Sequence, residues 1–179
     1  MNVMLYNIRF ILCFIFFFII SVIILYSQNN NKSYFFQELI KNKSSIIGKA
    51  RIIDGDSLLI SENEIRLQDI DAPEYKQQCN DKNYIKYDCG IDALLYLKKL
   101  TNGNIVNCKI SGKDFYNRYL GTCYVNEKNL NKLMIRSGNA IKFGADSKYY
   151  QDELYAKVNK HGIWQGDFIT PRQYRKNNK

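Results

Sequence analysis

Residues 53–74 read IDGDSLLISENEIRLQDIDAPE, and this stretch carries the signals that decide the fold. Asp54-Gly55 and Asn63 are turn residues. They separate three short runs rich in Ile and Leu, at 46–54, 57–62 and 64–70. Short apolar runs bounded by turn residues are typical of β-strands. We therefore expect the fold to open with a meander of three strands.

Downstream, the pattern changes to a helix and then returns to strands. Residues 90–101 place apolar side chains at positions 91, 94, 95 and 97, which is a helical spacing. We expect strands at 104–110 and 119–125, joined by a polar connection at 111–118. Two helices are expected after them, at 129–140 and 149–159. Five short strands with a helix after the third predict an α+β fold, namely an OB-type β-barrel with about three peripheral helices.

The amino-terminal part has a different composition from the rest of the chain. Residues 10–26 are apolar except for Ser21. As a helix this run would reach ~25 Å, slightly short of a ~30 Å hydrocarbon core, yet it is longer than a typical cleaved signal core. The pattern predicts a membrane or export segment and leaves its cleavage open. We expect this segment to occupy residues 1–26, followed by a polar spacer at 27–45. One domain at 46–166 and a basic tail at 167–179 complete the expected organisation.

Charge and aromatic content indicate a class of partner. The 179 residues include 26 Lys and Arg against 17 Asp and Glu, for a net charge of +9, and 14 Tyr. Such a surface suits a polyanion, because Lys and Arg neutralise phosphates and aromatic faces stack on bases. A cationic surface without any role in nucleic-acid binding fits the same composition.

The cysteines bear on the compartment. Cys13 lies in the apolar run, and the other four, Cys79, Cys89, Cys108 and Cys123, lie in the predicted domain. Three pairings are possible, but the spacing favours Cys79 with Cys89 across a polar loop and Cys108 with Cys123 across a hairpin. Disulfides would place the domain outside the cytoplasm. Four buried free thiols are the alternative, whereas a zinc site is disfavoured because the chain has no Cys-x-x-Cys pair and a single His.

Acidic side chains are concentrated between Asp54 and Glu74, next to predicted strand ends. Asp56 follows the first turn, and Asp71 and Glu74 flank Pro73. Adjacent strands can bring these ends together. Two carboxylates with a backbone carbonyl and waters form the hard oxygen set that Ca²⁺ prefers. Solvated charges at turns are the alternative on chemistry alone.

Three ordered motifs resemble the staphylococcal nuclease (thermonuclease) family. They are IDGDSLLI, IRLQDIDAPE and DFYNRYLG, beside the family pattern IDGDT, RLxGIDxPE and DxYGR. The similarity runs from about Ile47 to Trp164, and the cysteine placement is similar to that of the family's exported four-cysteine branch. The resemblance implies an OB-fold enzyme that uses Ca²⁺ to hydrolyse phosphodiester bonds in DNA and/or RNA.

The resemblance also implies a metal site and a base. Asp56 and Asp71 would bind Ca²⁺ through their carboxylates, and Ala72 through its carbonyl oxygen. Glu74 would be the general base that activates the attacking water.

Substrate contacts follow from the same motifs. Arg66 and Arg118 would clamp the scissile phosphate. Tyr116 could stack on the nucleotide, with a buried hairpin tyrosine as the alternative. Asn117 replaces the glycine before the arginine, and Asn is the best non-glycine residue for a left-handed turn position.

Two classes of function compete. The first is a membrane-anchored or secreted, extracytoplasmic nuclease, monomeric and in contact with the membrane through residues 10–26 unless they are cleaved. The second is a catalytically inactive OB-fold module that binds nucleic acid or a protein. Arg66, Glu74 and Arg118 occur together, which favours the enzyme because a module without catalysis does not need all three. A cell-envelope phosphodiester other than nucleic acid stays open as the substrate.

Overall fold

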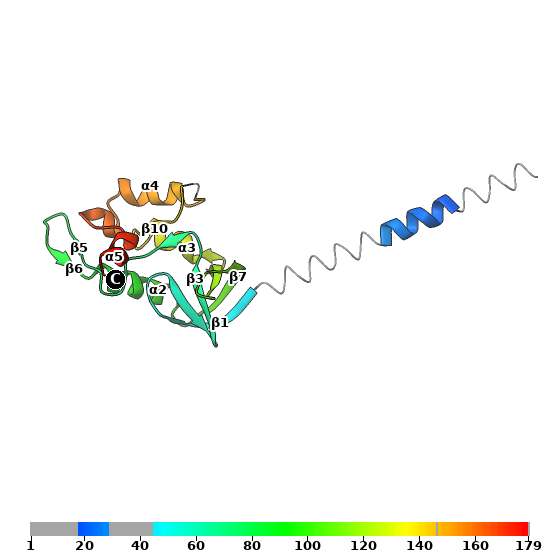
Figure 1. Ribbon diagram of the computed structural model, residues 1–179, viewed down its shortest axis with the longest axis horizontal. Helices are drawn as coiled ribbons and strands as arrows, with labels where there is room; N and C mark the ends of the chain where they lie inside the picture. Colours follow the sequence, from blue (N-terminus) through cyan, green and yellow to red (C-terminus); the bar gives the residue numbers. More distant parts are fainter. Residues whose placement is uncertain (1–17, 29–44, 146, 179) are drawn as a thin grey trace, which may run out of the picture. The chain divides into compact units, whose positions relative to one another are not determined.

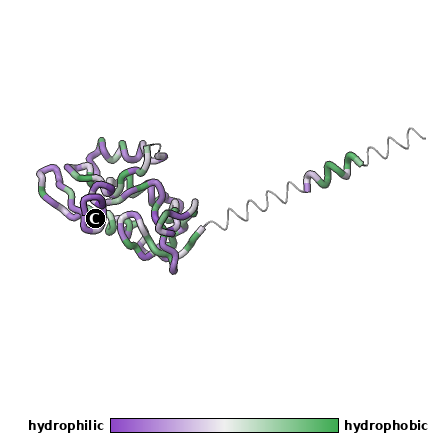
Figure 2. Tube along the Cα trace, viewed as in Figure 1, coloured by the Kyte–Doolittle hydropathy of each residue, from purple (hydrophilic) through white to green (hydrophobic). Residues whose placement is uncertain are grey.

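The structure is a computed structural model, and it describes residues 18–28, 45–145 and 147–178 (Figure 1). The chain divides into two units, residues 1–43 and 44–179. In the first unit, residues 18–28 are helical and mostly apolar (Figure 2). Of the helices in the described ranges, none has the length and apolar character needed to cross a membrane. The expected membrane segment, residues 10–26, lies partly outside the described residues and stays a prediction.

The described part of the second unit is built around a closed barrel of five strands. In order around the barrel these are β3 (Asn63–Leu67), β2 (Ser57–Ile60), β1 (Ser45–Ile52), β7 (Ile105–Lys113) and β8 (Tyr119–Val125). Neighbouring strands are antiparallel except β3 and β8, which pair in parallel and close the barrel (Figure 1). This confirms the predicted α+β fold with an OB-type barrel.

Alternating side chains of these strands fill the barrel, because successive residues of a strand point to opposite faces. In β8, for example, the buried positions are Gly121, Cys123 and Val125. The core also takes one face of the helix inserted after the third strand, through Ala93 and Leu97. The barrel is therefore a rigid base for the loops that leave it.

Helices lie outside the barrel strands. In the described part of the second unit they are α2 (Cys89–Thr101), α3 (Leu130–Arg136), α4 (Tyr150–Val158), the 3₁₀ turn η1 (Gly162–Gln165) and α5 (Pro171–Asn177). The first three α-helices confirm the prediction. Helix α3 ends earlier than expected because Gly138, at φ 71°, adopts the left-handed conformation that stops a helix. Helix α5 lies in the segment that composition marks as a basic tail.

Short strand pairs lie outside the barrel. They are β4 (Ile70–Asp71) with β10 (Ile141–Lys142), β5 (Cys79–Asn80) with β6 (Lys86–Tyr87), and β9 (Lys128–Asn129) on the edge of β8. The strand expected at 64–70 is divided into β3 and β4, because Asp69 has a φ of 63° and turns the chain. After this bend, Asp71 belongs to β4, which pairs with β10 outside the barrel.

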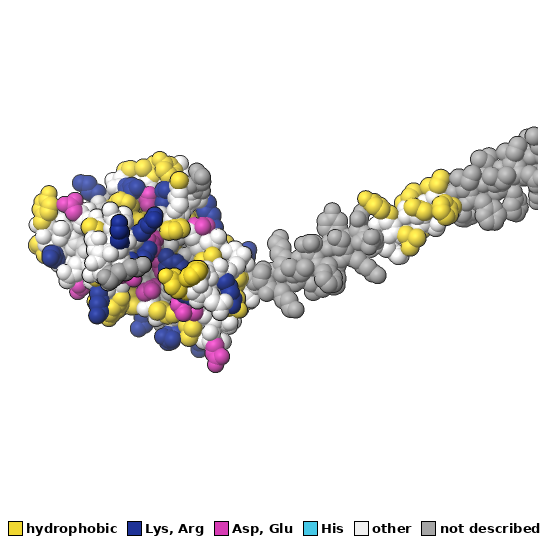
Figure 3. All heavy atoms as spheres, in the orientation of Figure 1, with side chains coloured by type: hydrophobic (Ala, Val, Ile, Leu, Met, Phe, Trp, Pro, Cys, Tyr) yellow, Lys and Arg dark blue, Asp and Glu magenta, His cyan; other side chains and the backbone are white. Residues whose placement is uncertain are grey.

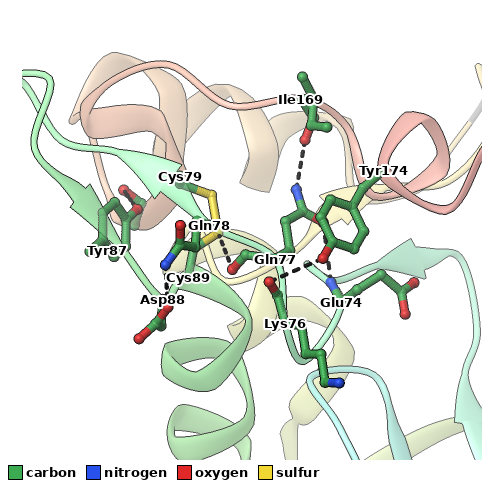
Figure 4. Close-up of a disulfide and its surroundings, with 11 residues drawn as sticks. Glu74, Lys76, Gln77, Gln78, Cys79, Tyr87, Asp88, Cys89, Ile169 and Tyr174 are labelled. Atoms are coloured by element: carbon green, nitrogen blue, oxygen red, sulfur yellow. Dashed lines mark hydrogen bonds between the residues drawn. A yellow bond between two sulfur atoms is a disulfide. The ribbon is translucent and has the colours of Figure 1, made fainter. Parts of the chain in front are cut away.

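Two disulfides join elements of the second unit. Cys108 and Cys123 are directly opposed in β7 and β8. Cys79 of β5 is linked to Cys89, the first residue of α2 (Figure 4). Both pairings are those predicted from the spacing.

Candidate active site

One cavity collects side chains from all the motifs of the sequence. It has a volume of about 600 Å³ and is lined by Asp54, Asp56, Glu64, Arg66, Ala72, Pro73, Glu74, Tyr116, Arg118, Phe143 and Arg175. Of the residues predicted to hold metal, act as base or contact substrate, each lines it except Asp71, which is buried at 2% exposure and accepts a hydrogen bond from Arg66. Segments around β2, β3 and β4, the β7–β8 hairpin and α5 contribute to its walls.

The turn between β1 and β2 sets the position of Asp56. The Ile53 amide donates to the Ser57 carbonyl at 2.9 Å, and the Asp56 amide donates to Asp54 Oδ1 at 3.0 Å. Gly55 is needed here, because a Cβ on it would come within 2.7 Å of Ala72 Cβ. The tight turn brings the Asp56 carboxylate beside the segment that follows β4.

The Asp56 carboxylate is almost completely buried, at 4% exposure. It accepts hydrogen bonds from Arg66 Nη1 at 2.6 Å, the Ala72 amide at 2.9 Å and Ser57 Oγ at 3.1 Å. Burial raises the pKa of Asp56 to about 7, against the lowering effect of Arg66. Further positive charge would therefore favour its ionised form.

Arg66 joins the two carboxylates that the metal was expected to use. Its Nη2 donates to Asp71 Oδ1 at 3.0 Å while Nη1 holds Asp56. The Arg66 side chain is 19% exposed, and it lines the cavity. Nη2 also donates to the Ile70 carbonyl at 3.5 Å. A guanidinium has five N–H donors, so these three bonds leave others for a ligand.

Glu74 lies on the loop after β4, and Gln77 fixes that loop. The Gln77 side chain accepts from the Glu74 amide at 3.2 Å, and the Gln77 amide donates to the Glu74 carbonyl at 2.7 Å (Figure 4). The Glu74 carboxylate points away from the disulfide and accepts a 2.6 Å bond from Arg175 of α5. Arg175 donates hydrogen bonds to Asp71 and, as a smaller effect, to Glu74, and these bonds raise the pKa of Arg175 above its ordinary value.

The β7–β8 hairpin presents Arg118 to the cavity. Asp114 accepts from the Arg118 amide at 3.0 Å and from its Nε at 2.8 Å. Burial acts against it, but hydrogen bonds from Arg118 hold the pKa of Asp114 below its ordinary value. Asn117 has a φ of 66°, the left-handed conformation predicted for it. Tyr116 is 75% exposed with the Arg118 guanidinium 5.6 Å from its ring, so the buried-tyrosine alternative is wrong.

Comparison with known proteins identifies the family. The sequence profile described as "Staphylococcal nuclease homologue" matches residues 64–166, more than half of the chain. The chain belongs to the staphylococcal nuclease family.

Curated relatives agree with this membership. The "Succinoglycan biosynthesis protein ExoI" of Rhizobium meliloti is 37% identical over 123 residues, covering 66% of this chain and 64% of that protein. An "Uncharacterized endonuclease" of Escherichia coli O157:H7 is 30% identical over 137 residues, covering 70% of this chain and 81% of that protein. Another of Haemophilus influenzae is 31% identical over 138 residues, covering 72% of each. The chain thus spans just under two thirds of the first of these relatives.

Sequence reasoning from the family motifs missed several side chains of the cavity, and Arg175 above all. The motif residues come from one third of the chain, whereas Arg175 lies 104 positions after Asp71. One local signal exists: Thr170 and Gln173 form a capping box with Pro171 at the helix start, which predicts a helix here. No local signal indicates where that helix packs.

The donor chemistry fits the Ca²⁺ of the staphylococcal nuclease family. Asp56 and Asp71 offer carboxylate oxygens, and Ala72 between them and Glu74 offers a carbonyl, all hard ligands. Across the described ranges, no three Asp, Glu, Cys or His side chains approach closely enough to form a metal-binding group by themselves. A cation here would therefore depend on backbone oxygen and water as well as on two carboxylates.

Proposed function

We propose that the protein is a Ca²⁺-dependent nuclease that hydrolyses phosphodiester bonds of DNA and/or RNA. The observation that carries this proposal is the convergence on one cavity of two guanidiniums, from Arg66 and Arg118, with Glu74 and Asp56. A phosphodiester carries negative charge and needs donors for its oxygens and a base for the attacking water. The cavity of this family member offers both.

Each side chain then has a defined part in the reaction. Water gives a proton to the Glu74 carboxylate as its oxygen forms a bond to phosphorus. The bond from phosphorus to one ester oxygen breaks, and that oxygen takes a proton from solvent. Arg66 and Arg118 donate to the equatorial oxygens, on which charge builds in the transition state. Only arginine presents a planar pair of donors, so lysine would not be equivalent at either position.

Asp56, Asp71 and the Ala72 carbonyl would hold the Ca²⁺. When bound, the ion supplies positive charge that stabilises the phosphate in the transition state. The Arg66 bridge between Asp56 and Asp71 already holds these two carboxylates side by side. Their proximity supports a shared cation.

The rim of the cavity suits nucleic acid. Tyr116 and its neighbour Phe115 are exposed, at 75% and 96%, beside the phosphate-binding Arg118. Exposed aromatic rings next to arginine can stack on bases. Lys and Arg side chains are spread over the visible face of the globular unit (Figure 3), and the chain carries a net charge of +9. The word endonuclease in the names of two relatives agrees with this substrate.

We also propose an extracytoplasmic location, secreted or anchored through residues 10–26. The two disulfides support it, because such bonds persist in oxidising compartments.

Digestion assays test the proposed function. The purified full-length chain is incubated with single-stranded DNA, duplex DNA and RNA, in Ca²⁺ and in chelator. We expect cleavage in Ca²⁺ that chelator abolishes. Asp56→Ala should lose it, with partial recovery at very high Ca²⁺, because one metal ligand is gone. Asp167→Ala is the matched control, since that side chain is exposed and makes no hydrogen bond or ion pair among the described residues. Binding of nucleic acid without cleavage would instead support the inactive module.

A further inference from the structure

Arg175 contacts two carboxylates of the reaction centre from the far end of the chain. Its Nη1 lies 3.0 Å from Asp71 Oδ1 and 2.6 Å from Glu74 Oε1. Its Nη2 lies 3.1 Å from Asp71 Oδ2. The guanidinium therefore binds Asp71 with two nitrogens and Glu74 with one, a geometry that gives strong, directional hydrogen bonds.

These contacts occupy the oxygens that a metal would use. Asp71 Oδ1 accepts from both Arg66 and Arg175, and Oδ2 accepts from Arg175. A divalent cation bound to the same carboxylate would stand within a few ångströms of the Arg175 charge and repel it. Bidentate pairing by Arg175 and metal binding by Asp71 are thus alternatives.

Helix α5 is built to hold Arg175 at this place. The Thr170 hydroxyl accepts from the Gln173 amide at 3.3 Å, and the Gln173 side chain accepts from the Thr170 amide at 3.1 Å. The Tyr174 hydroxyl donates to the Lys76 carbonyl at 3.1 Å, two residues after Glu74 (Figure 4). The residue next in sequence, Arg175, is thereby directed at the acidic cluster.

A buried glutamine, Gln77, links the segment that precedes α5 to the loop that carries Glu74. Gln77 is fully buried, at 0% exposure. Its Nε2 donates to the Ile169 carbonyl at 2.8 Å, and its Oε1 accepts from the Glu74 amide (Figure 4). One side chain thus holds both the segment before α5 and the backbone of Glu74. The helix can stay docked through these bonds while the Arg175 side chain moves.

We propose that Arg175 is a positioning residue of the reaction centre that competes with the divalent cation for Asp71, so that helix α5 sets the metal affinity of the site. Metal binding replaces the Arg175 charge on Asp71 with that of the ion, and Arg175 keeps its bond to Glu74 or turns into the cavity. The inference rests on the proposed function, because it assigns Asp71 to the metal.

Calorimetric titration of the full-length chain with Ca²⁺ tests it. Arg175→Gln removes the charge and leaves the capping box and the Tyr174 contact in place. We expect its Kd for Ca²⁺ to fall about tenfold below that of the wild type, the usual worth of a hydrogen bond between charged groups. Arg172→Gln is the matched control, an exposed arginine of the same helix without an ion pair in the described part of the chain. Its Kd should stay within about twofold of the wild type.

Thermal unfolding provides a second readout. In chelator, Arg175→Gln should unfold at a lower temperature than Arg172→Gln, because Asp71 and Glu74 lose a cation. In saturating Ca²⁺ this difference should shrink. Arg175→Lys, which keeps one charge but not the two-pronged contact, serves if the glutamine variant does not fold, and its Kd should also be lower than that of the wild type.

The outcomes separate this inference from the proposed function. A wild type that binds Ca²⁺ and cleaves DNA, with both Arg175 variants binding Ca²⁺ no more tightly, would overturn the competition and leave the nuclease intact. Absence of Ca²⁺ binding in all variants, without cleavage, would overturn both. Tighter binding in the Arg175 variants alone supports the competition.

Discussion

The orientation of the Arg118 side chain is fixed by its neighbours in the β7–β8 hairpin. Asp114 binds its Nε and its backbone amide, and the side chain lies beside Tyr116. Nη2 also lies 2.7 Å from Asp114 Oδ2. The remaining nitrogen, Nη1, is 3.9 Å from Glu64 Oε1, which is too far for a hydrogen bond. This end of the guanidinium is available to a phosphate oxygen, whereas the Asp114 end only fixes its direction.

Replacing Arg118 by Ala should therefore lower the cleavage rate by about 10² to 10³, because the lost donor acts mainly as charge builds up in the transition state. Single-turnover digestion of one DNA substrate measures this. Arg51→Ala, an exposed arginine on β1, should stay close to the wild type. Loss of less than tenfold in the Arg118 variant would exclude it as a clamp.

At the scale of elements, the loop of Glu74 is positioned by the start of α2. Gly90 is the second residue of that helix, and a Cβ on it would overlap the carbonyl oxygens of Glu74 and Tyr75. Its amide also donates to the Gln77 carbonyl at 3.2 Å. The helix and the loop can pack this closely only because position 90 has no side chain.

Gly90→Ala should displace the Glu74 loop. We expect a loss of about 1 to 3 kcal/mol in the free energy of unfolding, as for other overpacked sites. The cleavage rate should fall by up to about 10², because a base moved by about 1 Å is misplaced. Urea unfolding and digestion assays measure the two effects. Gly112→Ala is the control, since a Cβ there meets nothing within 4 Å; equal behaviour of the two variants would contradict this account.

The disulfides act at the same scale. Cys108–Cys123 closes a loop of sequence separation 15 between two barrel strands. Replacing both residues by Ala should reduce the free energy of unfolding by roughly 2 to 4 kcal/mol, since the unfolded chain gains freedom. Urea unfolding measures the loss, and the wild type in reductant should lose at least as much, because reductant also opens Cys79–Cys89. Mass mapping that finds free thiols in the protein isolated from its native cells would remove both the bridge and the argument for the proposed compartment.

The elements differ in how well the sequence predicts them. Strands β1, β2 and β3 are bounded by turn residues and have apolar side chains, so their signals are local. The bend at Asp69 depends on a single left-handed residue, which composition does not reveal. Helix α5 has almost no apolar stripe, and only its capping box indicates it. The contact of Arg175 with Asp71 joins residues 104 positions apart, and no local pattern can encode such a distance.

At the scale of the whole molecule, a small barrel brings motifs far apart in sequence to one cavity. Strand pairing of β3 with β8 sets Arg66 opposite Leu120, two residues after Arg118. The turn before β2 and the bend before β4 add the acidic side chains, and α5 adds a third guanidinium. Sequence motifs predict the two guanidiniums of Arg66 and Arg118 and the acidic side chains, because each motif lies beside a strand of the barrel. The guanidinium of Arg175 depends on how the carboxyl-terminal segment folds back onto the cavity.

The most direct measurement of the central claim is the rate at which the full-length chain and its Glu74→Gln variant cleave the same single-stranded DNA in saturating Ca²⁺. We predict a rate lower by about 10² to 10⁴ in the variant, the usual contribution of a positioned general base. Fold and Ca²⁺ binding should be nearly unchanged, because Gln keeps the size and one oxygen of Glu. Glu62→Gln, on the exposed turn between β2 and β3, should cleave like the wild type. Equal Ca²⁺-dependent rates for the wild type and Glu74→Gln would contradict the assignment of this cavity as the catalytic centre.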